Sequence, residues 1–293
     1  MSSSEDRAAA PAAHPAQSSH DSTLDRLIRI LDAFASDRPV LHVAALARRA
    51  NLPLPTAYRW VDRLVGAGLL QRHEDGTVGP GLRLWELAAR SAPTASLRDT
   101  ARPFMDDVQA VLRQHTQLAV LDEDGVLVIE RLSARGAVAN QASVAGRLPT
   151  FTTALGLVLL AHSRRHVTEA FLTSHQDALG QPLVWGTGHD VGSARGVVNP
   201  TEAVLRQKIA EVRRLGYAAL DGQVDDETTG VAVPILGGDG SMLAALGVVV
   251  PRHSDLAPGL APMLLAAARG ISRALAAQPA AHQHHAHPRP PQA

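Results

Sequence analysis

Apolar residues in the first part of the chain recur every three or four positions in three short segments. This spacing predicts three amphipathic helices, each with one face turned to a core. Asn51-Leu52-Pro53 interrupts the pattern before the third helix, and Pro55 suits the first turn of a helix. The predicted helices span 24–34, 43–50 and 55–66.

The third helix is followed by a pattern typical of a β-hairpin. Residues 69–72 and 77–79 read as strands, and Asp75-Gly76 supplies the turn between them. Three short helices followed by a hairpin predict a winged helix-turn-helix whose recognition helix is 55–66. Two further helical stretches, 82–89 and about 97–114, connect this unit to the rest of the chain.

Strand and helix patterns alternate in the second half of the chain. Asp122-Glu123-Asp124-Gly125 and Gly237-Gly238-Asp239-Gly240 each join two strand patterns, which indicates antiparallel hairpins. Residues 175–199 are rich in glycine and lack periodic apolar positions, so we expect a long surface loop there. The strands are predicted at 117–121, 126–132, 218–220, 230–236 and 243–250, and the helices at 153–163, 166–174, 201–215 and 256–277.

These elements predict an α+β protein with two domains, as 293 residues allow. Both ends of the chain are rich in Ala, Pro, Ser and His, a composition typical of disordered tails. The expected divisions are a tail over 1–20, a winged helix-turn-helix domain over 21–84, linker helices over 85–112, a second domain with an α+β sheet over 113–277, and a His/Pro-rich tail over 278–293.

Positive charge is concentrated in the helix-turn-helix, although the whole chain has a formal net charge of zero. Between residues 48 and 72 five arginines accompany a single acid, Asp62. Thr56, Arg59 and Arg63 share one face of the third helix, opposite a stripe of Ala57, Trp60, Val61 and Leu64. A solvated amphipathic helix is the alternative, but the order of elements favours DNA contact. The candidate DNA-binding residues are Arg48, Arg49, Thr56, Tyr58, Arg59, Arg63 and, in the wing, Arg72.

The composition narrows the remaining chemistry. The chain has no cysteine, which excludes disulfides and thiolate sites, and no apolar run long enough for a membrane span or signal core. We therefore expect a cytoplasmic protein with no cofactor. His162 and His166 share a helix face without a clear third ligand, and the histidines of the C-terminal tail have no fixed geometry, so no metal site is predicted.

Two other classes of protein compete with a DNA-binding regulator. An enzyme is disfavoured because the chain lacks H-E-x-x-H, G-x-S-x-G, P-loop and G-x-G-x-x-G motifs. A winged helix used as a protein-interaction scaffold, without effector sensing, stays open on the sequence.

From Thr23 to about residue 277 the chain resembles the IclR family of bacterial transcriptional regulators. LARRANLPLPTAYRWVDRLVGAGLL (46–70) is similar to that family's second helix, turn and recognition helix, and HEDGTVGPGLRLWEL (73–87) to its wing and following helix. LPTFTTALGLVLLA (148–161) and RLGYAALDGQVDDETTGVAVPIL (214–236) resemble two blocks of its effector domain.

The resemblance implies a winged helix joined to a GAF-like effector-binding domain in a homodimer or dimer of dimers. The partners would be palindromic double-stranded operator DNA and a small carboxylate or aromatic acid, with control of a catabolic or transport operon. The sequence does not distinguish a repressor from an activator. The implied effector-binding residues are Phe151, Thr152, Thr153, Ala154, Leu155, Leu220, Asp221, Gly230, Val231, Gly247 and Val249.

Two departures from the family pattern change these expectations. Leu54-Pro55-Thr56 stands where relatives commonly have Lys-Ser-Thr, which removes a cation and a capping hydroxyl from the recognition helix. The pocket positions Leu220, Gly230, Gly247 and Val249 are often polar in the family, and here they offer no side-chain donor. We therefore expect a larger or more apolar effector, such as an aromatic acid, whose carboxylate meets the start of the helix near Thr152 and Thr153.

Overall fold

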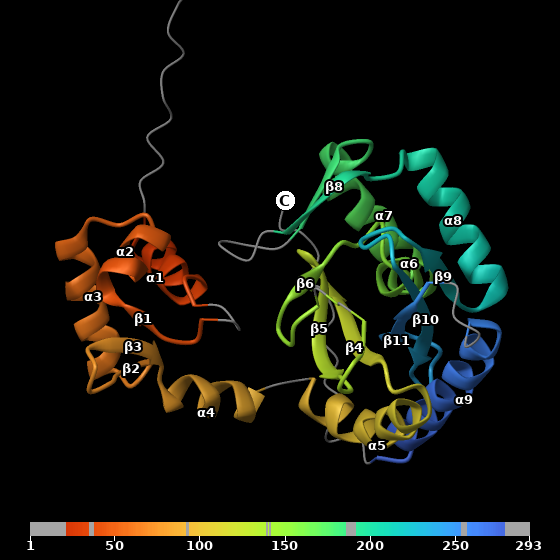
Figure 1. Cartoon of the computed structure of the whole chain (residues 1–293), viewed down its shortest axis with the longest axis horizontal. Helices are drawn as coiled ribbons and strands as arrows, with labels where there is room; N and C mark the ends of the chain where they lie inside the picture. Colours follow the sequence, from red (N-terminus) through yellow and green to blue (C-terminus); the bar gives the residue numbers. More distant parts are fainter. Residues whose placement is uncertain are drawn as a thin grey trace, which may run out of the picture.

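The computed structural model describes residues 22–34, 38–91, 94–138, 140, 142–185, 192–252 and 257–278. Figure 1 shows an N-terminal lobe and a larger C-terminal lobe, with helix α4 extending from the first toward the second. The predicted tails lie outside the described residues, apart from Gln278.

The N-terminal lobe is the predicted winged helix-turn-helix. Ser22 opens its first helix with a capping box, accepting from the Asp25 amide at 3.0 Å while the Asp25 carboxylate accepts from the Ser22 amide at 2.9 Å. The strands form one antiparallel sheet in the order β1-β3-β2, so the predicted hairpin gains a third strand. The elements are α1 Thr23–Asp32, β1 Leu41–His42, α2 Val43–Arg49, α3 Leu54–Gly66, β2 Leu70–Arg72 and β3 Thr77–Pro80.

Two helices follow the wing. Helix α4 (Leu82–Ser91) leaves the N-terminal lobe, and α5 (Ala95–Leu112) packs on the C-terminal sheet. Arg98 Nε and Arg102 Nη1 lie 3.7 and 3.5 Å from the carboxylate of Glu130 on the sheet. These ion pairs attach the linker helix α5 to the C-terminal lobe.

The C-terminal lobe is built on a six-stranded sheet in the order β6-β5-β4-β11-β10-β9. Every neighbouring pair in it is antiparallel, and the two predicted hairpins are confirmed as β4-β5 and β10-β11. The strands are β4 His115–Asp122, β5 Gly125–Leu132, β6 Arg147–Leu148, β9 Ala218–Asp221, β10 Thr228–Leu236 and β11 Met242–Pro251.

Helices cover both faces of this sheet and create two separate apolar cores. Helices α5 and α9 enclose one core with Leu118, Val233 and Leu246, whereas α6 and α8 enclose the other with Ala119 and Ala232. Strand alternation explains this division, since neighbouring residues of a strand point to opposite faces. The helices of this lobe are α6 Ala154–His162, α7 Arg165–Ser174, α8 Glu202–Leu215 and α9 Ala257–Ala276.

The prediction of a long loop over 175–199 is wrong. A 3-10 turn (Gln176–Ala178) is followed by two antiparallel strands, β7 (Pro182–Trp185) and β8 (Gly192–Val198). Residues 192–198 carry no alternating apolar pattern, and the two strands pair only with each other. Backbone hydrogen bonds hold a local hairpin that apolar periodicity does not reveal.

Helix α6 packs unusually closely against its surroundings because glycines occupy its contacts. Its residues from Ala154 to Ala161 are all buried. A methyl group added at Gly156 would overlap the carbonyl oxygen of Thr150, and one at Gly247 of β11 would stand 2.9 Å from Leu155. Glycine at these two positions therefore allows the start of α6 to lie directly on the sheet.

Replacing Gly156 by alanine should destabilise the C-terminal lobe by about 1 to 3 kcal/mol, because the added methyl meets backbone that cannot rotate away. Chemical denaturation followed by circular dichroism measures this loss. Gly259→Ala is the matched control, since Gly259 is helical and exposed with no atom near its added methyl. Equal stability of the two variants would contradict this account of α6 packing.

Candidate functional site

The predicted recognition helix α3 has one buried face and one exposed face. Ala57, Val61 and Leu64 are at most 4% exposed and pack on the other helices. Arg59 and Arg63 are exposed, and 46% of Tyr58 is accessible. The exposed face thus offers two guanidinium groups and a phenol, which can donate to base edges or phosphates.

Trp60 packs against the core from the predicted inward stripe. Its side chain is only partly buried, and the guanidinium carbon of Arg63 lies 5.6 Å from the centroid of its ring. This cation–π contact restrains one of the two arginines that the helix presents.

The wing residue Arg72 contacts the recognition helix. Its Nη2 donates to Oδ1 of Asp62 at 2.8 Å, a pairing that the sequence did not reveal. Both side chains are exposed enough that the pair contributes little stability. The pair instead positions the Arg72 guanidinium of the wing beside Asp62, the only acid between residues 48 and 72.

The remaining predicted DNA-binding residues surround the start of α3. Arg48 is exposed in the last turn of α2, while Arg49 and Thr56 are half-buried. Pro53 precedes α3 and offers no capping side chain, and Leu54 is 44% exposed. The first turn of α3 therefore presents backbone amides that can meet a phosphate, without the cation expected from relatives.

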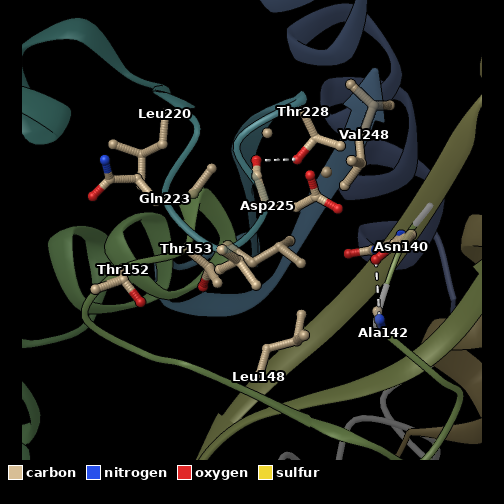
Figure 2. Close-up of a pocket in the computed structure, with 17 residues that line it drawn as sticks. Asn140, Ala142, Leu148, Thr152, Thr153, Leu220, Gln223, Asp225, Thr228 and Val248 are labelled. Carbon is tan, nitrogen blue, oxygen red and sulfur yellow. Dashed lines mark hydrogen bonds between the residues drawn. The ribbon is translucent and has the colours of Figure 1, made fainter. Parts of the chain in front are cut away.

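A cavity of about 90 Å³ lies in the C-terminal lobe where the start of α6 meets strands β10 and β11. Figure 2 shows Thr152 and Thr153 on one side and Asn140 and Ala142 on another, with Asp225 and Thr228 between them. The lining residues are Gln117, Asn140, Ala142, Leu148, Thr152, Thr153, Ala154, Leu155, Leu220, Gln223, Val224, Asp225, Thr228, Gly230, Gly247, Val248 and Val249.

Most of the predicted effector residues line this cavity, but three do not. Phe151 packs edge-on against Phe171 with ring centroids 6.0 Å apart. The Asp221 carboxylate accepts from the hydroxyl of Thr229 at 2.5 Å, and Val231 belongs to the core on the other face of the sheet. The predicted residues that line it are Thr152, Thr153, Ala154, Leu155, Leu220, Gly230, Gly247 and Val249.

Three polar groups around the cavity are buried without a hydrogen-bond partner. They are the hydroxyl of Thr152, the Nε2 amide of Gln117 and the Nδ2 amide of Asn140. Buried donors of this kind are costly to leave unpaired. Together they can donate to an acceptor-rich small molecule such as a carboxylate.

Thr153 lines the cavity and also begins helix α6. Its hydroxyl donates to the carbonyl of Pro149 at 2.6 Å and accepts from the amide of Gly156 at 3.1 Å. It is therefore the N-cap of α6 rather than a donor to a ligand. Of the two threonines, Thr152 is the one whose hydroxyl remains available.

The segment between β9 and β10 closes another side of the cavity. The amide of Thr228 and its hydroxyl each donate to the carbonyl of Asp225 at 3.1 Å, and the amide of Glu227 donates to its carboxylate at 3.0 Å. These short-range bonds order the turn. Of the acids in this segment, Asp225 is the one that lines the cavity.

The described part of the chain contains neither a candidate metal cluster nor a candidate membrane span. Its His, Asp and Glu side chains form no group of three placed to hold a metal ion. No described helix combines the length and apolar character needed to cross a bilayer.

Comparison with known proteins agrees with the two-part architecture. The description "IclR helix-turn-helix domain" matches residues 23–74, and "Bacterial transcriptional regulator IclR C-terminal" matches residues 90–190.

Individual relatives extend over most of the chain. A crystal structure of an IclR homologue from Microbacterium hydrocarbonoxydans complexed with 4-hydroxybenzoate is 40% identical, covers 88% of this chain and 100% of its own, and superposes with a TM-score of 0.75. The Pca regulon regulatory protein of Pseudomonas putida is 26% identical over 86% of this chain and 84% of its own length. The regulator KdgR of Dickeya chrysanthemi is 26% identical over 86% of this chain and 79% of its own.

These relatives are named as transcriptional regulators, and their matches include the DNA-binding helices. The chain is accordingly a DNA-binding regulator and not an enzyme. It belongs to the IclR family of bacterial transcriptional regulators.

Proposed function

We propose that this regulator binds a small aromatic carboxylate in the cavity at the start of α6 and that binding changes its affinity for operator DNA. The observation that carries the proposal is the lining, in which apolar Leu220, Val249 and backbone at Gly247 face the unpaired donors of Thr152 and Gln117. An aromatic acid has the matching division into an apolar ring and an acceptor group. The 40% identical Microbacterium protein, crystallised with 4-hydroxybenzoate, supports the same class of ligand.

The size of the cavity limits the effector to a small molecule. A cavity of roughly 150 Å³ holds one benzene ring, whereas this one measures about 90 Å³. A single-ring acid therefore requires an outward shift of the lining. The turn from Gln223 to Thr228 is suited to such a shift, because the hydrogen bonds that order it join residues of the turn itself. Such a shift gives the effector two conformations to distinguish.

The regulatory mechanism follows from this difference. We propose that the effector domain (113–277) passes its change through the linker helices (85–112) to the winged helix-turn-helix domain (21–84). Ligand affinity that differs between two arrangements shifts their populations and so changes operator affinity. The operon controlled would be one for catabolism or transport of the acid.

We further propose that the chain acts as a homodimer on a palindromic operator, alone or as a dimer of dimers. Helix α4 is exposed around most of its circumference, with Leu82 70%, Trp85 67% and Leu87 49% accessible. Large apolar side chains on an extended helix favour burial against a second copy of the chain. Pairing of two recognition helices would explain recognition of two half-sites.

Dimer formation through α4 predicts that Trp85→Glu shifts the protein toward a monomer, because the charge opposes burial of that face. Light scattering coupled to size-exclusion chromatography measures the mass. Val111→Glu on α5 is the control, since Val111 is 69% exposed and should leave the mass unchanged. A wild-type monomer, or a dimer that survives Trp85→Glu, would contradict pairing through α4.

Arg59→Ala should weaken operator binding by about 1 to 3 kcal/mol if its side chain contacts a base edge. If Arg59 contacts phosphate instead, binding should weaken equally on all sequences. The slope of log affinity against log salt concentration should then decrease by about one. Gel shifts on the upstream region of its own gene, at several salt concentrations, measure both. Arg214→Ala, an exposed arginine of α8, should bind as the wild type does.

Unchanged binding by Arg59→Ala would remove that residue from the DNA interface. Absence of any salt-sensitive shift with the wild-type protein would instead favour a scaffold that uses its winged helix for protein contacts.

Thr152→Val should weaken binding of 4-hydroxybenzoate roughly ten- to a hundredfold, because a hydrogen bond to a charged group contributes about 1.5 to 3 kcal/mol. The unliganded variant should be at least as stable as the wild type, since an unpaired buried hydroxyl is removed. Calorimetry and thermal unfolding measure the two effects. Thr116→Val is the matched control, because its hydroxyl is also buried and unpaired but lies outside the cavity lining.

Equal affinity of the two valine variants would show that Thr152 does not contact the carboxylate. Micromolar binding of glyoxylate or pyruvate, with no binding of aromatic acids, would overturn the proposed effector class.

A further inference from the structure

One wall of the cavity comes from the described residues of 133–146, between β5 and β6, which we call the wall segment. Asn140 and Ala142 line the cavity from this segment, and the amide of Ala142 donates to the Asn140 carboxamide oxygen at 3.0 Å. That bond leaves the Nδ2 amide of Asn140 as the unpaired donor (Figure 2). The position of this donor therefore depends on what holds the segment in place.

Three side chains at the ends of β4 and β5 hold the wall segment by its backbone. Oε1 of Gln114 accepts from the amide of Val138 at 3.1 Å, and Nε2 of His115 lies 2.6 Å from the Val138 carbonyl. Nη1 of Arg131 donates to the carbonyl of Ala142 at 2.6 Å. Both groups of Val138 and the carbonyl of Ala142 are thus bound on either side of Asn140.

The partners of His115 identify the tautomer of its neutral ring. Nε2 faces a carbonyl and must donate to it, so Nδ1 carries the lone pair of the neutral ring. Nδ1 lies 2.9 Å from the hydroxyl of Ser133 and 3.3 Å from Nη2 of Arg131, and both of these groups can donate to it. A proton on Nδ1 would replace an acceptor by a donor that faces a guanidinium group.

We propose that His115 and Arg131 are positioning residues that hold the wall segment on the effector cavity only while His115 is neutral, so that acidification releases the wall and weakens effector binding. The proposal rests on the proposed function, because it concerns the same cavity. Strand register supports the proposal. Arg131 pairs directly with Gln117, the strand residue whose unpaired amide lines the cavity.

The surroundings of His115 determine the direction of the pH effect. Strand β5 contributes Arg131, the wall segment contributes Ser133 and Val138, and β11 contributes the paired Val249, so Arg131 is the charged neighbour among them. Burial lowers the pKa of His115 below 6.5, and the charge of Arg131 lowers it further. A base with a lowered pKa binds fewer protons when folded, so its contribution is complete above pH 6.5 and is lost as the pH falls through its pKa.

The test measures 4-hydroxybenzoate affinity by calorimetry between pH 7.5 and 5.0, together with hydrogen exchange of peptides from 133–148 in the ligand-free protein. An aromatic carboxylate stays largely ionised at pH 5, because ordinary carboxyl groups titrate near pH 4. We expect the wild type to lose about three- to tenfold in affinity over this range. After correction for intrinsic rates, the 133–148 peptides should exchange faster at the acidic end.

Three variants separate the proposed roles. His115→Gln should bind the acid more weakly at pH 7.5 and show no further loss on acidification, because the amide does not titrate. Arg131→Met should also bind more weakly, and its loss should begin at a higher pH, since the cation that opposes protonation is absent. His162→Gln is the control, because burial lowers the pKa of His162 as well but this residue lies outside the cavity lining.

The outcomes distinguish the inference from the proposed function. If 4-hydroxybenzoate does not bind at pH 7.5 but wall peptides still lose protection on acidification only when His115 is present, the effector class is wrong and the positioning role stands. If wall protection is independent of pH, or if His115→Gln keeps the wild-type pH profile, the inference is overturned.

Discussion

The C-terminal lobe depends on how closely helix α6 approaches the central sheet. Gly156 and Gly247 remove the side chains that would separate this helix from the Thr150 backbone and from β11. An apolar helix buried on all sides needs such contacts, because any gap would forfeit dispersion contacts that water cannot replace. One cavity lies at the first turn of α6, where Thr153 caps the helix and the sheet face carries small residues.

The same constraint explains the character of the cavity. Gly230 and Gly247 contribute backbone rather than side chains, so most of the surface is apolar. Thr152 precedes the helix, Gln117 lies on β4, and Asn140 belongs to the irregular wall. A mostly apolar pocket with a few fixed donors discriminates ligands by where they carry acceptors more than by their overall polarity.

Elements with several turns or several alternating residues could be predicted from the sequence, and so could the short strands beside the Asp75-Gly76 turn, whereas the two-residue strands could not. Helix α3 and strand β11 carry enough periodic positions to define their buried faces. Leu41–His42 and Arg147–Leu148 are two-residue strands, too short for any alternation, and they exist because a neighbouring strand offers unpaired backbone groups. The hairpin of β7 and β8 was missed because residues 192–198 carry no alternating apolar pattern.

For the site, the sequence indicates which face a residue occupies where one element carries the signal. The arginine face of α3 can be inferred from helical spacing, and the start of α6 from its capping pattern. Gln117 could have been found from the alternation of β4, but Asn140 has no periodicity around it, and the contact of Arg72 with Asp62 joins residues from different elements. Phe151, Asp221 and Val231 were expected at the cavity from the family resemblance, which does not tell on which face of a strand or turn each side chain lies.

The pleat of strand β5 directs two neighbouring side chains to opposite faces of the sheet. Glu130 faces the linker helix, where it pairs with Arg98 and Arg102, and the next residue, Arg131, faces the cavity wall. Consecutive residues of a strand share a peptide plane and cannot move independently. A shift of the β5 backbone at this point would therefore reach the wall through Arg131 and the ion pairs of α5 through Glu130 at the same time.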